Sequence, residues 1–389
     1  MVATRGLVGL RPDPARVALV TTPPYDVIKA GSALERTLAA RADSMFHVIL
    51  GPTPRPALDG LRERGALVPD ETPALYVYEQ RWGEGESRTG VLLAVEVTDY
   101  RAAQIIRHEK TFDDKVKGRV ALANATEHTI GPVFLLTKAE LGELLERAKQ
   151  GAPLYTFESD FGPGSDLSGI ASRVWRVPEA SELGRALVER LAPSPLYIAD
   201  GHHRYHAALL NGHTHALAYV TEEAKILAYN RVVNGTVPFA EARAELIGLE
   251  PADRFETPDK HRFAVYTKQG CWTLPAREVP GDVVGRLDCT ILERELYPRL
   301  GLAHRHIVDP AHFDYYPESA LDEMRAVVDD GSYELAIALH PVSIGELMAV
   351  ADAGLSDPDV VMPEKSTFFS PKILTGLFLY RHACSSAPG

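Results

Sequence analysis

Residues 195–210 read PLYIADGHHRYHAALL: an apolar run, a short polar run and a second run with helical spacing. The first run predicts a buried strand over 195–199, and the last predicts a helix over 205–210 that stops at Asn211-Gly212. Gly201 lets the backbone turn tightly between them. The first N–H groups of such a helix point toward the turn, which makes this turn a natural anion site.

The polar residues of this turn suit a phosphate group. Arg204 offers a bidentate fork, and His202 and His203 offer further donors to phosphate oxygens. Asp200 does not suit an anion pocket unless a Mg²⁺ ion, or a hydroxyl about to lose its proton, offsets its charge. The plainer alternative is a capped turn with Asp200 as the N-cap and both histidines solvated.

A second polar segment, His108–Arg119, is dense in charge and poor in apolar residues. Successive residues of a strand face opposite ways, so His108 and Lys110 could serve one face and Glu109 and Thr111 the other. The alternative is a solvated surface.

A third segment, Met362–Lys372, contains Lys365-Ser366-Thr367 but lacks the glycines of a P-loop. Its lysine and hydroxyls could still reach a phosphate, or the segment could be only a capped loop. Pro24-Tyr25-Asp26 is an ordinary turn signal that could help to hold the active loop.

Helices and strands intermingle along the rest of the chain without a steady βαβ rhythm, which predicts an α+β fold rather than a doubly wound sheet. Strands are expected at 74–78, 90–95, 129–136, 215–220, 262–266 and 335–339, and helices at 32–42, 140–149, 180–191, 290–300 and 344–353.

Composition narrows the class of protein. The 389 residues include 41 Lys+Arg and 53 Asp+Glu, a net charge of −12 that argues against general nucleic-acid binding. Cys271, Cys289 and Cys384 have neither disulfide-scaffold nor zinc-finger spacing, so free thiols and no structural metal are expected. No stretch approaches the ~20 apolar residues of a membrane span, so a cytoplasmic protein without a membrane partner is expected.

These segments occur in an order that resembles, nearly end to end, the bacterial and archaeal family known as domain of unknown function 1015. The motifs that carry the resemblance are Pro23-Pro24-Tyr25-Asp26-Val27-Ile28, Tyr76-Val77-Tyr78-Glu79-Gln80, His108-Glu109-Lys110-Thr111, Ala199-Asp200-Gly201-His202-His203-Arg204-Tyr205 and the whole of 362–372. The resemblance supplies no activity, because the family is named for lacking one.

A more distant likeness does imply chemistry. Gly201-x-His203-Arg204 is similar to the phosphate-gripping loop of the ParB/sulfiredoxin-like superfamily, which implies a ParB/sulfiredoxin-like core with a mixed sheet and flanking helices, plus additional α/β domains. Sulfiredoxins carry a catalytic cysteine where this chain has His202, so their sulfur chemistry is lost. ParB proteins carry a DNA-binding helix-turn-helix, and no basic recognition helix is evident here. The Asp-Gly-x-His-Arg form is closest to archaeal kinases that phosphorylate free serine.

The resemblance implies three segments: an N-terminal α/β domain (1–145), a ParB/sulfiredoxin-like segment with the loop (146–240) and a C-terminal α/β region (241–389). The expected function is a kinase that uses ATP or ADP with Mg²⁺ on a small hydroxylated metabolite such as free serine; a homo-oligomer is compatible with the sequence. The expected catalytic residues are Asp200, Glu109 and His108. The expected phosphate- or nucleotide-binding residues are Gly201, His202, His203, Arg204, Lys110, Thr111, Arg119, Lys365, Ser366 and Thr367. Two alternatives stay open, a nucleotide-binding regulatory protein without transfer activity and a phosphate-ester hydrolase.

Overall fold

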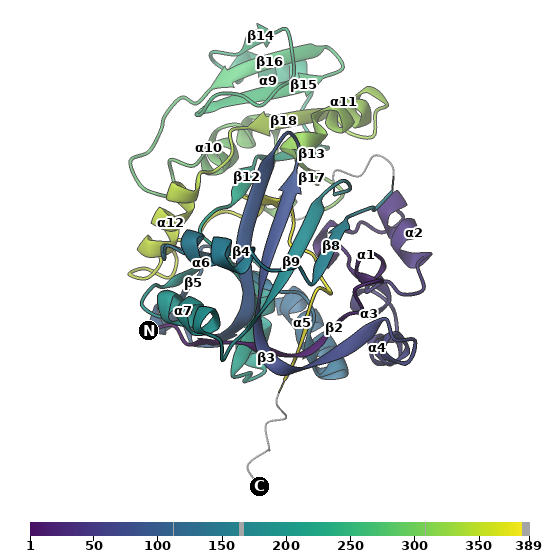
Figure 1. Cartoon of the computed structure of the whole chain (residues 1–389). Coiled ribbons are helices and arrows are strands. Elements are labelled where there is room, and N and C mark those ends of the chain that lie inside the picture. The colour runs from purple at the N-terminus through teal and green to yellow at the C-terminus, as the bar shows by residue number, and fades with distance from the viewer. Residues whose placement is uncertain (112, 163–166, 308, 383–389) are drawn as a thin grey trace. The chain divides into compact units, whose positions relative to one another are not determined.

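The computed structural model describes residues 1–111, 113–162, 167–307 and 309–382, and these fall into two compact units. The first unit comprises Met1–Arg107, Thr111–Ala224 and the chain from Pro371 onward; the second comprises His108–Lys110 and Lys225–Ser370. The three segments expected from the sequence stay a prediction. Figure 1 shows the elements of each unit.

A mixed sheet organises the first unit. Its main path runs β5 (Ile105–Ile106), β10 (Leu196–Asp200), β7 (Val133–Thr137), β11 (His215–Thr221), β4 (Glu86–Glu96), β3 (Leu67–Trp82), β2 (Leu7–Pro12), β20 (Leu379–Arg381) and β6 (His128–Thr129). Three more strands pair beside this path: β1 (Thr4–Arg5), β8 (Tyr155–Glu158) and β9 (Ala171–Pro178). Strand β10 is antiparallel to β7, whereas β11 is parallel to β7. The sheet is therefore mixed, as expected for an α+β fold.

The helices of the first unit include those predicted from hydrophobic spacing. They are α1 (Val17–Val20), α2 (Ala33–Ala39), α3 (Phe46–Ile49), α4 (Pro54–Glu63), α5 (Asp113–Thr126), α6 (Gly142–Ala148), α7 (Glu182–Leu191) and α8 (His202–Leu210). Helix α2 begins where the Ser32 hydroxyl accepts a hydrogen bond from the Glu35 N–H, a standard N-cap. The strands expected at 74–78 and 90–95 form a hairpin, with β3 and β4 joined by a turn at 83–85.

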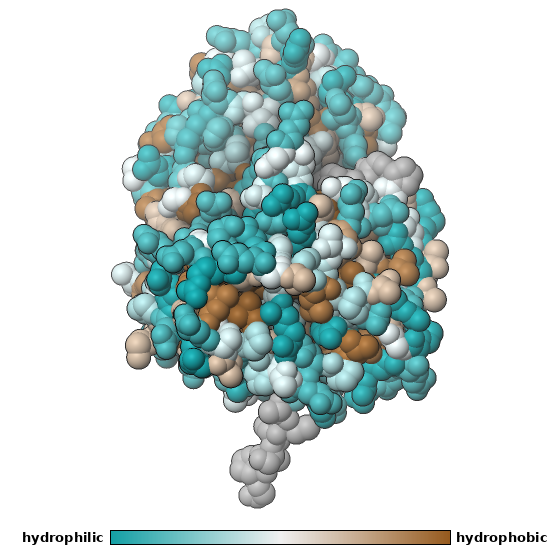
Figure 2. All heavy atoms as spheres, viewed as in Figure 1, coloured by the Kyte–Doolittle hydropathy of each residue, from teal (hydrophilic) through white to brown (hydrophobic). Residues whose placement is uncertain are grey.

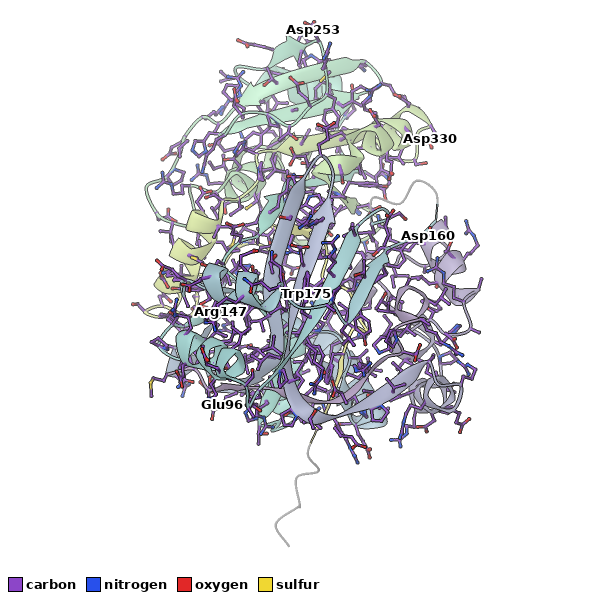
Figure 3. The ribbon with its side chains drawn as sticks, viewed as in Figure 1. Glu96, Arg147, Asp160, Trp175, Asp253 and Asp330 are labelled. Atoms are coloured by element: carbon purple, nitrogen blue, oxygen red, sulfur yellow. The ribbon has the colours of Figure 1, made fainter. Side chains whose placement is uncertain are left out.

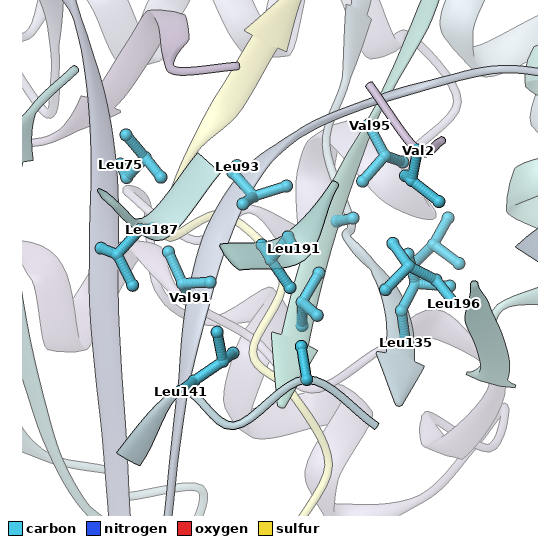
Figure 4. Close-up of a cluster of buried hydrophobic side chains, with 14 of the residues drawn as sticks. Val2, Leu75, Val91, Leu93, Val95, Leu135, Leu141, Leu187, Leu191 and Leu196 are labelled. Carbon is cyan, nitrogen blue, oxygen red and sulfur yellow. The ribbon is translucent and has the colours of Figure 1, made fainter. Parts of the chain in front are cut away.

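A hydrophobic core fixes the strands that lead to the polar turn. Leu135 of β7 and Leu196 of β10 belong to one buried cluster with Leu187 and Leu191 of α7 (Figure 4). Each fully buried leucine contributes about 1.5–3 kcal/mol relative to an exposed one. On β9, which lies between β3 and β8, the Trp175 indole N–H donates to the Gly151 carbonyl (3.0 Å; Trp175 is labelled in Figure 3). The end of β10 is thus held on a rigid base.

The second unit is built on an antiparallel sheet. Its order is β14 (Glu250–Ala252), β16 (Gly270–Pro275), β15 (Arg262–Thr267), β18 (Leu335–Leu339), β13 (Tyr229–Val233) and β17 (Phe313–Pro317), and a separate ribbon pairs β12 (Lys225–Leu227) with β19 (Phe368–Ser370). Its helices are α9 (Phe239–Glu245), α10 (Asp288–Glu295), α11 (Leu321–Asp329) and α12 (Ile344–Ala353). Met324 and Val328 of α11 pack on Val232, Ala336 and Ala338 of the sheet.

These observations confirm the α+β class, while the ParB/sulfiredoxin-like core stays a prediction. Cys271 and Cys289 are free thiols, and Cys384 lies outside the described residues. Within the described ranges, no helix combines the length and the apolar character needed to cross a bilayer. The face shown in Figure 2 carries mainly hydrophilic side chains with scattered apolar ones.

Candidate functional site

The polar turn after β10 is the start of a helix. Helix α8 begins at His202, earlier than expected, so the two histidines and Arg204 form its first turn. Gly201 is the N-cap, with φ +98°, and no side chain caps the helix. The alternative with Asp200 as N-cap is therefore wrong: Asp200 is the last residue of β10. The Arg204 and Tyr205 N–H groups donate to the Gly201 carbonyl (2.9 and 3.0 Å), and the positive end of the helix dipole faces the turn.

Two cations hold the Asp200 carboxylate. Lys372 Nζ lies 3.1 Å from Asp200 Oδ2, and Arg204 Nη2 lies 3.4 Å from Oδ1. Burial alone raises the pKa of Asp200, but the charges of Lys372 and Arg204 outweigh burial and hold the pKa well below its ordinary value. Asp200 is therefore ionised at neutral pH and already neutralised by the protein.

Lys372 is a site residue that the sequence analysis missed. It closes the Met362–Lys372 motif, but it belongs to the first unit, whereas Lys365, Ser366 and Thr367 belong to the second. Its side chain is buried. One signal could have found it, because a carboxylate at the end of a buried strand needs a counter-charge and this motif ends in a lysine.

Arg119 is a further cation of the site, and it lies over the ring of Tyr25. Arg119 Cζ lies 3.8 Å from the centroid of the Tyr25 ring. Burial lowers the pKa of Arg119, and the nearby charge of Arg204 lowers it further. Its Nε is buried and, within the described part of the chain, has no hydrogen-bond partner. Two guanidinium groups of like charge thus stand close together, an arrangement that an anion would relieve.

A pocket of about 550 Å³, counting the space at its mouth, lies between α5 and α8. On α5 the lining begins with Arg119, continues with apolar side chains and ends with His128, just beyond the helix. On α8 it begins with Arg204, continues with two alanines and ends with His213, just beyond that helix. The lining residues are Tyr25, Ile49, Arg119, Leu122, Ala123, His128, Thr129, Ile130, Gly131, Arg204, Ala207, Ala208, His213 and Thr375. The pocket therefore has a cationic end, apolar walls and a neutral polar end.

The two histidines of the turn have different environments. His202 is buried, and His203 is partly exposed. Burial, followed by the charges of Lys115 and Arg204, lowers the pKa of His203 to about 4. At neutral pH the His203 ring is therefore uncharged and can donate a single N–H to a ligand.

Substituting Gly201 should damage both the turn and Arg204. A Cβ at Gly201 would lie 2.7 Å from Arg204 Nε, and φ +98° is strained for any residue with a Cβ. We expect Gly201→Ala to destabilise the fold by about 1–2 kcal/mol and to weaken anion binding, measured by urea denaturation and calorimetry. The control is Gly118→Ala in α5, where nothing lies within 4 Å of the added Cβ. Equal effects of the two substitutions would contradict this role of Gly201.

The other predicted residues belong mainly to the second unit. There the His108 carbonyl accepts a hydrogen bond from the Met362 N–H (2.8 Å), so the His108–Lys110 and 359–362 stretches lie together. Lys110 Nζ forms an exposed ion pair with Asp359 Oδ1 (3.0 Å). The expected strand alternation over 108–111 is wrong, because β5 ends at Ile106 and residues 108–109 form a bend. Thr111 lies in the first unit, just ahead of α5.

The Lys365-Ser366-Thr367 run forms part of a turn that leads into β19. Lys365 has φ +57°, and its ammonium lies 5.3 Å from the Tyr229 ring centroid and 5.8 Å from that of Tyr315. Ser366 is buried, and its hydroxyl donates to the Pro363 carbonyl. That these residues, with His108, Glu109 and Lys110, serve the same ligand as the Gly201–Arg204 turn stays a prediction.

Fold and site together define an α+β protein with an arginine-lined pocket at an uncapped helix N-terminus. The chain belongs to the family described as "Protein of unknown function (DUF1015)", whose model matches residues 5–290. This confirms the resemblance found in the sequence.

Solved structures similar to this chain share little sequence with it. A free serine kinase mutant in complex with ADP is 13% identical, with a TM-score of 0.37 over 74% of this chain and 92% of that one. A conserved hypothetical protein from Pyrococcus furiosus is 14% identical (TM-score 0.36; 74% and 95%), and C-terminally truncated SbnI from Staphylococcus aureus is 12% identical (TM-score 0.39; 74% and 87%). The search of curated proteins gave no match.

Proposed function

We propose that this protein is a nucleotide-dependent phosphotransferase that acts on a small hydroxylated metabolite. The observation that carries the proposal is the pairing of Arg119 and Arg204 at one end of a pocket, beside the uncapped start of α8. The charge of Arg204 lowers the pKa of Arg119, and a phosphate group between the two guanidinium groups would relieve this repulsion.

The pocket supports a nucleotide rather than a bare phosphate. Its lining joins a cationic end to apolar walls, which suits a phosphate attached to an apolar or aromatic group. Phosphates would meet Arg119 and Arg204, and the nucleoside would lie along the apolar walls formed by Leu122 and Ala207. The Asp-Gly-x-His-Arg form of the turn implies an acceptor such as free serine, and this acceptor is part of the proposal.

The state of Asp200 bears on its catalytic role. A carboxylate with a strongly lowered pKa is a weak proton acceptor, so Asp200 suits orienting an acceptor hydroxyl better than deprotonating it. Glu109, with His108 beside it, is then our candidate for the base. Positioning and charge stabilisation dominate phosphoryl transfer, and Arg119, Arg204 and the α8 N–H groups supply both.

The Asp200 carboxylate is poorly suited to bind Mg²⁺. Both of its oxygens already face cations, Lys372 and Arg204, whereas Mg²⁺ prefers carboxylate oxygens free of such partners. We therefore assign Asp200 no part in holding a metal and derive no step through one. Mg²⁺ bound by the nucleotide phosphates stays an expectation.

The neutralised Asp200 also favours a second candidate function. If no other group accepts the acceptor's proton, the pocket would bind nucleotide without transferring phosphate, as in a regulatory protein. Labelled ATP incubated with a pool of hydroxylated metabolites separates the two functions. Label in an organic product supports the transferase, and label found only in inorganic phosphate contradicts it.

Calorimetric titration with ATP, ADP, CTP and pyrophosphate tests the binding that both functions share. We expect Arg204→Met and Arg119→Met each to weaken binding by about 10- to 100-fold, because each removes a charge-assisted contact worth about 1.5–3 kcal/mol. The matched control is Arg147→Met on α6, whose guanidinium forms an exposed pair with Glu182 (3.1 Å). Absence of binding by the wild-type chain, or unchanged binding by both pocket variants, would refute the proposal.

A further inference from the structure

We infer that Arg88 is a positioning residue which, together with Gln80, holds Lys372 against Asp200 and thereby frees Arg204 for the ligand. The inference rests on the proposed function, because it concerns the charge balance of that pocket. Arg88 does not line the pocket. It acts through the stretch that begins at Pro371.

Arg88 and Gln80 hold two consecutive carbonyls of this stretch. They are cross-strand partners on β4 and β3, and both side chains are buried. Arg88 Nη2 donates to Gln80 Oε1 and to the Pro371 carbonyl, each at 2.6 Å. Gln80 Nε2 donates to the Lys372 carbonyl (3.0 Å). The backbone of Lys372 is thus fixed from the sheet, while its ammonium reaches Asp200.

Fold stability alone does not account for an arginine at this position. Only 2% of Arg88 is exposed, and within the described ranges no carboxylate pairs with it. Its Nε and Nη1 also lack hydrogen-bond partners there. The rings of Phe134 (4.8 Å to the centroid) and Tyr219 (5.8 Å) compensate part of the desolvation. A buried cation without a carboxylate costs free energy, so hydrogen bonding to the Pro371 carbonyl, which a neutral donor could also supply, does not by itself explain the charge of Arg88.

Arg88 affects ligand binding through the position of Lys372. Phe134, whose ring lies 4.8 Å from the Arg88 guanidinium, is the cross-strand partner of Asp200. If Lys372 moved, Asp200 would draw Arg204, with which it also forms an ion pair, closer. Arg204 would then be less available to a phosphate. The arrangement predicts that loss of Arg88 weakens ligand binding without any loss of a ligand contact.

The test compares Arg88→Met with Arg173→Met in the full-length chain. Arg173 is exposed on β9, a strand that also pairs with β3, so its variant matches the chemical change without the buried contacts. The probe is pyrophosphate, titrated by calorimetry, alongside urea denaturation. We expect Arg88→Met to bind pyrophosphate about 10-fold more weakly while the urea curve shows that it is folded, and Arg173→Met to match the wild type in binding.

A pH profile separates positioning from mere packing. With Lys372 displaced, the pKa of Asp200 should rise toward its ordinary value, so the acid-side change in pyrophosphate affinity should move to higher pH in Arg88→Met. Lower stability with wild-type affinity and an unshifted profile would overturn the inference. Should Arg88→Met fail to fold, Gln80→Leu removes the bond to the Lys372 carbonyl, and wild-type affinity in that variant would also overturn it. If wild-type chain itself fails to bind pyrophosphate, the proposed function fails first.

Discussion

Replacing Lys372 with methionine is expected to destabilise the protein by about 3 kcal/mol, because it leaves the Asp200 carboxylate without its nearer counter-ion. Arg204 remains at 3.4 Å, which places the effect at the lower end of the range for broken buried pairs. Urea denaturation at pH 7 measures it. The double variant Asp200→Asn/Lys372→Met should recover most of the loss, because it removes both charges together.

An exposed ion pair with nearly the same N–O distance supplies the control. Lys110 and Asp359 lie 3.0 Å apart but are largely solvent-exposed, so Lys110→Met should cost less than about 1 kcal/mol. Additive effects of Asp200→Asn and Lys372→Met would contradict the assigned coupling. The free energy of unfolding should also depend on pH through Asp200. Because the folded pKa of Asp200 is lowered, its stabilisation is present above about pH 4 and is lost as the pH falls toward the folded pKa.

The strand, turn and helix at the site could be predicted because each depends on neighbouring residues. An apolar run, a glycine and a helical pattern follow one another over 195–210, and the structure has them in that order. Only the helix start was placed too late. His202, His203 and Arg204 read as a polar loop, yet a glycine N-cap at positive φ let the helix begin among them.

The remaining site residues depend on contacts between distant segments. Lys372 meets Asp200 across 172 positions of sequence, and the Thr22–Thr375 backbone pairing brings the Tyr25 turn beside the C-terminal stretch. Such contacts follow from the order of strands in the sheet, which no local pattern encodes. The charged stretch that ends at Arg119 forms α5 in its second half. Arg119 is the α5 residue of the pocket lining that the sequence predicts, whereas Leu122 and Ala123 follow from the packing of α5 against α8.

Acidification should destabilise the first unit through histidines at the neutral end of the pocket. The His382 ring stacks on His213 with 3.6 Å between centroids, and its Nε2 lies 3.0 Å from the Thr129 hydroxyl. Burial, followed by the charges of His213 and His128, lowers the pKa of His382 to about 3. Burial also lowers the pKa values of His213 and His128. All three rings are therefore neutral in the folded protein at pH 7.

The sign follows from these lowered values. Below about pH 6.5 these histidines bind protons in the unfolded chain but stay neutral in the folded chain. The free energy of unfolding therefore falls as the pH falls toward the folded pKa. Between pH 7 and pH 5 this costs at most about 2 kcal/mol for His382, and roughly 1 kcal/mol after allowing for its partial exposure. Urea denaturation of His382→Gln should therefore show a smaller stability loss between these pH values than the wild type. Exposed His304→Gln should leave the loss unchanged. Equal losses in the wild type and both variants would show that protonation of His382 does not contribute to the pH dependence of stability. The measurements stay above about pH 4.5, so that the titration of Asp200 does not enter the comparison.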